Sequence, residues 1–151
     1  MVKVHTIEML EHSAKNFPTL KAHTDMINGS LVGMGDGVTV APASGSPVYV
    51  ILNQQVGDNE YKEDYPIAKD TYVNLYDVKA WEGKELDVSD SNIAYDGSEK
   101  YSDIVKGTEL TFDPDTFKFK IGVSSAGDVG FVVTGKWGQI VNGVTVKVVV
   151  K

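Results

Sequence analysis

The stretch Gly130–Lys151, GFVVTGKWGQIVNGVTVKVVVK, carries the clearest structural signal in this chain. Asn142-Gly143 stands between two apolar runs, and this dipeptide is typical of a type I′ hairpin turn because both residues tolerate positive φ. From Val144 to Val150, valine occupies every second position. Such an alternation indicates a strand with one buried face. Val149 is the apolar exception on the wetter face. We therefore predict a hairpin that turns at Asn142-Gly143 and lies centrally in a sheet or at a subunit contact, since an open apolar edge would aggregate.

Further apolar runs, separated by polar turns, recur upstream roughly every eight to twelve residues. Gly135 and Gly138 are expected as bends or bulges. The GxGxG run at 33–37 is predicted to be a hairpin turn, because it lacks the GK[ST] ending of a phosphate loop and no helix follows it. This spacing predicts an all-β fold, a small β-sandwich or β-barrel. The expected strands are 30–34, 37–41, 48–52, 72–78, 85–88 and a hairpin over 109–121 turning on Asp113–Thr116.

Residues 1–28 have a different character. Val2–His5 reads as a short strand or an extended arm, and Thr6 is a suitable cap for a helix over Glu8–Lys15. Pro18 ends that helix. The expected organisation is an N-terminal arm with a short helix at 1–28, followed by a single β domain at 29–151.

Composition excludes several functional classes. The chain has 151 residues, enough for one domain with a real core, and no cysteine for disulfides or thiolate chemistry. Its net charge is −7 and all 14 basic residues are lysine, which disfavours nucleic-acid binding and phosphoryl transfer. No apolar run reaches the length of a membrane span, and the N-terminus lacks a signal-peptide core. We therefore expect no membrane contact and a chain made in the cytoplasm.

No catalytic or metal-binding constellation is evident. The three histidines, His5, His12 and His23, all lie near the N-terminus and lack a zinc-type spacing. No nucleophile stands in a recognisable pattern with a base. The expectation is a protein that is not an enzyme and needs no metal or cofactor.

Two stretches resemble a known family. Lys3–Leu10, running on to Lys21-Ala22-His23, is similar to small proteins encoded beside the major capsid gene in tailed phages of Gram-positive bacteria. The segments Gly130–Val133 and Val144–Val148 resemble the ending of capsid decoration proteins. The resemblance implies a head decoration, or cement, protein on the exterior of the virion capsid. Such a protein binds the major capsid protein, clamps neighbouring capsomers, stabilises the shell and often acts as a homotrimer.

The N-terminal arm is the expected contact with the capsid or with other subunits, because it could add a strand or lay a helix on a partner. The candidate contact residues are His5, Ile7, Met9, Leu10, Phe17 and Leu20.

Two alternatives from other classes remain at this stage. In a carbohydrate- or cell-surface-binding β module, Trp81 and Trp137 would form a stacking platform, whereas core or interface packing is the competing interpretation for each ring. Exposure of both rings on one face would favour the module. A small β-barrel enzyme or inhibitor would instead require a deep pocket with convergent polar groups.

Overall fold

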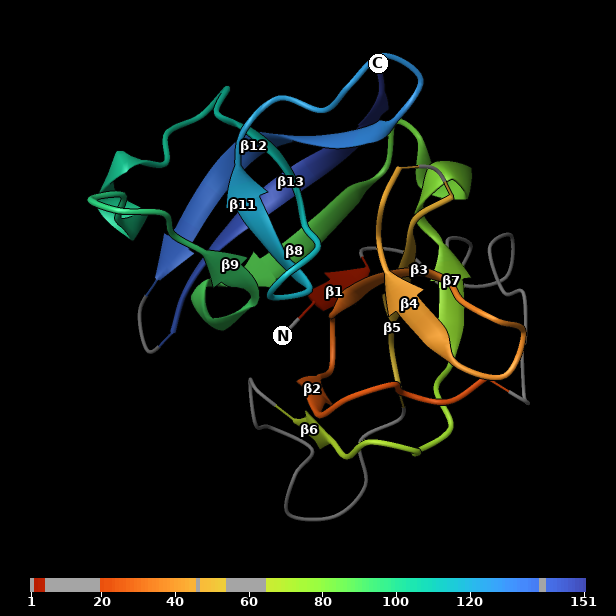
Figure 1. Cartoon of the computed structure of the whole chain (residues 1–151). Helices are drawn as coiled ribbons and strands as arrows, with labels where there is room; N and C mark the ends of the chain where they lie inside the picture. The colour runs from red at the N-terminus through yellow and green to blue at the C-terminus, as the bar shows by residue number, and fades with distance from the viewer. Residues whose placement is uncertain (1, 5–19, 46, 54–64, 139–140) are drawn as a thin grey trace.

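The computed structural model describes residues 2–4, 20–45, 47–53, 65–138 and 141–151. The predicted all-β fold is confirmed: strands form a seven-stranded, a four-stranded and a two-stranded sheet (Figure 1). The helical segments in the described part of the chain are short 3-10 turns, η2 (Val78–Trp81), η3 (Asp90–Asn92) and η4 (Tyr101–Asp103). The helix expected over 8–15 lies outside the described residues.

The seven-stranded sheet has the order β1-β8-β13-β12-β10-β11-β9, and all of its neighbours are antiparallel except β11 and β9. The strand β13, which carries the valine alternation, lies between β8 and β12, so its predicted central position is confirmed. The strands are β1 (Val2–Val4), β8 (Glu85–Ser89), β9 (Ile93–Ala94), β10 (Glu109–Asp113), β11 (Lys118–Ile121), β12 (Val129–Gly138) and β13 (Asn142–Val150).

The predicted alternation in β13 is confirmed, but the predicted turn is wrong. Val144, Val146 and Val148 are fully buried. Asn142 and Gly143 are not turn residues, because they pair with Gly138 and Trp137 in the β12–β13 ladder. Asn142 and Gly143 therefore belong to the strand ladder.

Gly143 is required by packing, and its φ is not positive. A Cβ at this position would lie 2.2 Å from Cζ2 of Trp137, so the indole can rest across the strand only because residue 143 has no side chain. The predicted bulge at Gly135 is confirmed by a register shift between Val133 and Gly135.

The polar segment before β10 is held against this hairpin by hydrogen bonds and a cation–π contact. The Tyr101 hydroxyl donates to the carbonyls of Trp137 and Gly143, at 2.9 and 2.7 Å. The Lys136 ammonium lies 4.1 Å from the centre of the Tyr101 ring and donates to the Tyr101 and Ile104 carbonyls.

The four-stranded sheet is antiparallel, in the order β4-β3-β5-β7, and lies beside the larger sheet (Figure 1). The hairpin predicted at 33–37 is confirmed, and its turn is held by the Asp36 carboxylate, which accepts from the amides of Val38 and Thr39. Its strands are β3 (Leu31–Met34), β4 (Val40–Pro42), β5 (Tyr49–Ile51) and β7 (Leu75–Asp77); β2 (Met26–Ile27) pairs with β6 (Pro66–Ile67).

The hairpin predicted over 109–121 is also confirmed, with Asp113 paired to Lys118 across the turn. The Asp113 carboxylate accepts from the Thr116 hydroxyl at 2.5 Å, and Phe117 takes the positive φ of 60° that closes the turn.

Two hydrophobic cores hold the sheets together. The first contains Trp81 with Phe119 and Phe131, whose rings meet edge to face at 4.7 Å, and it also includes Leu31 and Val50 of the four-stranded sheet. The second lies within the part of the molecule formed by the four-stranded and two-stranded sheets, which we call the smaller lobe. It includes Leu20, Ala22 and Met26. Because β1 pairs with β8 and these three residues are buried, the described parts of residues 1–28 are integral to the fold, and a boundary at residue 28 does not separate an arm from the β domain.

A chain of asparagine amides joins the lobes. The Asn92 side chain, just after β8, donates to the Asn28 carbonyl at 3.2 Å. The Asn28 side chain donates to the Asn53 carbonyl at 3.1 Å and accepts from its amide at 2.8 Å. The Asn53 side chain in turn accepts from the Asn74 amide at 2.8 Å. Buried amides of this kind fix the relative position of the segments that they connect.

Candidate interaction surface

The face of the seven-stranded sheet that points away from the core is open. We call it the outer face and define it by Glu85, Asp87, Val132, Thr134, Thr145, Lys147 and Val149. Since Val144, Val146 and Val148 point into the core, the residues between them point outward. The strands therefore present this face as one continuous surface.

A row of side chains crosses the outer face from β8 to β10. Glu85 lies opposite Lys147, Lys147 opposite Val132, and Val132 opposite Glu109. Glu109 also forms an ion pair with Lys151, with 2.5 Å between the Glu109 oxygen and the lysine nitrogen. Directly opposed residues in a sheet lie within contact distance. The row therefore places a valine between charged groups of both signs.

A second row contains the β-bulge of β12. The Thr145 hydroxyl donates to Asp87 at 2.7 Å, and the Thr134 hydroxyl donates to the Thr145 carbonyl at 3.3 Å. At the bulge, Gly135 adds no side chain, and a Cβ there would meet only the Thr145 Cβ at 4.0 Å. The surface is consequently hollowed at this point.

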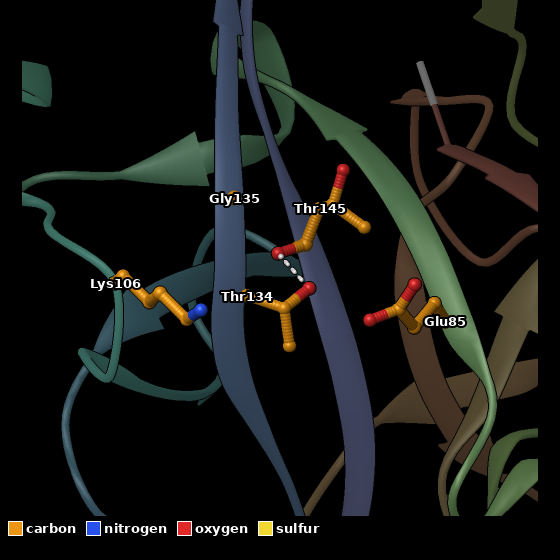
Figure 2. A pocket seen from close by; sticks show the side chains of 5 residues that line it. All are labelled: Glu85, Lys106, Thr134, Gly135 and Thr145. Carbon is orange, nitrogen blue, oxygen red and sulfur yellow. Dashed lines mark hydrogen bonds between the residues drawn. The ribbon is translucent and has the colours of Figure 1, made fainter.

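Figure 2 shows the resulting depression, with Glu85 on one side of the two threonines and Lys106 on the other. Its volume is about 530 Å³, and it is open to solvent. The lining residues are Glu85, Lys106, Thr134, Gly135 and Thr145. This lining offers a cation, an anion and hydroxyls for hydrogen bonds. Its chemistry suits the binding of a polar group.

Apolar residues lie at the other end of the outer face. Val149 and Val132 lie diagonally across the β12–β13 ladder. The loop after β11 lies against this ladder because Gly130 leaves room for it: a Cβ there would lie 2.9 Å from the Ser124 hydroxyl. Val123, next to Ser124, is 72% exposed. Valines flanked by charged groups resemble the apolar centre and polar rim of a protein–protein interface.

Leu20 is the one candidate contact residue named from the sequence that the structure describes. His5, Ile7, Met9, Leu10 and Phe17 lie outside the described residues. Leu20 is 2% exposed and belongs to the second core, so its side chain contacts this chain's own interior.

The two tryptophans do not form a common platform. Trp81 is 1% exposed and stacks on Tyr76 with 6.1 Å between the ring centres. Trp137 is half-buried and lies across Gly143. The condition that would have favoured a carbohydrate-binding module, exposure of both rings on one face, is not met.

Within the described ranges, no group of histidine and acidic side chains is arranged to hold a metal ion. No helix in that part of the chain is both long and apolar enough to cross a membrane. Comparison with protein-family models, with curated proteins and with solved structures finds no match.

The outer face was not identified from the sequence, although one signal for it was visible. Val149 was recognised as an apolar residue on the wetter side of its strand. Its diagonal neighbour Val132 comes from another strand, and only the strand register brings the two valines together.

Proposed function

We propose that this chain is a head decoration protein of a tailed phage, which binds the outer surface of the capsid and stabilises the shell. The observation that supports this function best is the outer face, a sheet surface on which the half-buried Val132 and Val149 lie among charged groups. Binding of one folded protein to another requires such a preformed surface, since a rigid sheet loses little conformational entropy on association.

The major capsid protein is the proposed partner. The outer face carries Glu85, Asp87 and Lys147, and Lys106 lines the depression in it, so the face complements a surface with both signs of charge. A polyanion such as nucleic acid would be repelled by the net charge of −7. The same net charge keeps free copies apart before they assemble. On the shell, we propose that three copies meet as a homotrimer.

The first test is the genomic neighbourhood: a major capsid gene should lie beside the gene for this chain. The second test is co-sedimentation of the purified chain with shells assembled from that capsid protein. We expect Val132→Lys and Lys147→Glu each to weaken binding about tenfold or more, because each change removes complementarity near the centre of the face.

Matched controls are available on the smaller lobe. Val38, at the β3–β4 hairpin, is 57% exposed, and Lys69 follows β6 on the surface. Val38→Lys and Lys69→Glu repeat the two chemical changes away from the outer face and should leave binding unchanged. If the control variants lose as much binding as the outer-face variants, or if neither outer-face variant loses binding, the outer face is not the binding surface. Failure of the unmodified chain to bind the shells would overturn the function itself.

A further inference from the structure

The edge of the seven-stranded sheet is completed by a very short strand. β1 has three residues and pairs with β8 alone, with Val2 opposite Val88, Lys3 opposite Asp87 and Val4 opposite Leu86. Figure 1 shows β1, in dark red, at the place where the two larger sheets meet. Few backbone hydrogen bonds therefore hold this strand.

One side chain of β1, that of Val2, packs closely against Gly29, and we call this position the Gly29 seat. Val2 is 6% exposed and packs against Gly29, which has a φ of +90°. A Cβ on Gly29 would lie 2.7 Å from a methyl group of Val2 and 2.9 Å from the Asn92 amide nitrogen. The seat therefore exists because residue 29 is glycine, and it lies at the end of the asparagine chain that joins the lobes.

Without β1, the edge of β8 would be a strong template for another strand. Leu86 and Val88 are fully buried, and the outward backbone groups of β8 would lose their partners. Unpaired strand edges of this kind recruit extended segments from other chains. The combination of a short resident strand and a shaped seat describes an acceptor site for a strand with valine at its first position.

We propose that this acceptor site, the β8 edge with the Gly29 seat, takes β1 from a second copy of this chain, so that neighbouring copies exchange their N-terminal strands. The exchanged strand makes the same contacts as the resident one, so exchange changes the interaction free energy little. Residues 5–19 connect β1 to Leu20, and such a connection spans at most about 50 Å when extended. A compact domain of this length has a radius of gyration of about 15 Å, and that reach exceeds it.

Concentration decides which copy supplies the strand. A strand tethered to its own acceptor has an effective concentration on the order of millimolar. Free copies at micromolar concentration therefore keep their own β1, whereas copies held side by side at millimolar local concentration exchange it. The inference does not rest on the proposed function, although a capsid surface would supply that crowding.

The absence of cysteine in the chain allows a direct test. Lys3 and Asp87 are directly opposed, and cysteines at opposed strand positions lie close to disulfide distance. A Lys3→Cys chain is mixed with a tagged Asp87→Cys chain from about 10 µM to about 1 mM, oxidised, and run on a non-reducing gel. A covalent heterodimer can form efficiently only if β1 of one copy lies on β8 of the other.

We expect the heterodimer to increase with concentration and, near 1 mM, to exceed about tenfold the background from Lys3→Cys mixed with Ser98→Cys, a surface loop position. Adding Val2→Asp to the Lys3→Cys chain should abolish it, because the seat cannot hold a carboxylate. In the double variant Lys3→Cys/Asp87→Cys, the two cysteines should form a disulfide within one chain at about 10 µM. Closure within the chain with no heterodimer at 1 mM would show that β1 is fixed, and no closure at all would show that β1 is not in this register; either result overturns the proposal.

Discussion

Replacing Gly143 with alanine tests the packing of the β12–β13 hairpin directly. The new Cβ would lie 2.2, 2.3 and 2.6 Å from three atoms of the Trp137 ring. Carbon atoms in contact are about 3.5–4.0 Å apart, so the closest approach is roughly 1.3 Å too short. An indole is rigid, and the overlap can be relieved only if the whole ring swings away from the strand.

The expected destabilisation follows from that displacement. Overpacking typically costs about 1–3 kcal/mol, and the displaced ring also loses part of its contact with the sheet. We expect a decrease of about 2–3 kcal/mol in the free energy of unfolding, which for a chain of this length lowers Tm by roughly 5–10 °C. Thermal unfolding followed by circular dichroism measures the shift, and tryptophan fluorescence reports the exposure of the ring.

The matched control is Gly135→Ala in the partner strand, where the added Cβ would meet only the Thr145 Cβ at 4.0 Å, an ordinary contact distance, and should change Tm little. The decisive experiment is a double-mutant cycle. In a Trp137→Val background, Gly143→Ala should cost less than about 0.5 kcal/mol, because the clashing ring is absent. An equal penalty in both backgrounds would refute the packing argument and would indicate that residue 143 needs glycine for its backbone conformation.

Three further outcomes are expected. Tyr101→Phe removes the hydroxyl that donates to the Trp137 and Gly143 carbonyls and should lower the unfolding free energy by about 1–2 kcal/mol in urea titrations, without changing the m-value. Asn92→Ala breaks the asparagine chain between the lobes and should cost about 1–3 kcal/mol, whereas Ser98→Ala in the loop after β9 should be neutral. Burial alone would raise the pKa of Asp113, but hydrogen bonds from Thr116 and Asp115 and the charge of Lys120 outweigh it and hold the pKa below its usual value. The stabilisation from Asp113 is therefore present above the unfolded pKa of about 3.9 and is lost as pH falls through the lowered folded pKa, so Asp113→Asn should flatten the loss of stability below about pH 4 in acid titrations.

Local patterns in the sequence predicted most of the strands correctly. The 109–121 hairpin followed from its aromatic and aliphatic residues around Asp113-Pro114, and the buried face of β13 followed from the alternating valines. The Asn142-Gly143 turn was placed wrongly because two demands on glycine look identical in sequence. A type I′ turn needs glycine for positive φ, and a crossing tryptophan needs it for space. Only the β12–β13 register, with Gly143 opposite Trp137, distinguishes them.

Pairings between distant segments could not be predicted. β1 finds its partner β8 more than eighty residues away, and β9 joins β11 in parallel although η4 and β10 lie between them in the sequence. The sequence of a short strand such as Val2–Val4 does not indicate which other strand it pairs with. The outer face has the same difficulty, because Glu85, Val132 and Lys147 become neighbours only through strand order. Val149 was the one residue whose position on the wetter face indicated an unusual surface.

The position of β13 within its sheet also determines when this protein can fold. β13 is synthesised after all the other strands of the sheet, yet it lies between β8 and β12 and joins the β1-β8 pair to the rest. A nascent chain that has emerged only to Gly138 therefore holds two separate groups of strands with apolar faces uncovered. Closure waits for the last strand to leave the ribosome, and because it relies on contacts between distant residues it is expected to be slow. Chains that end before β13 would be substrates for proteases and chaperones.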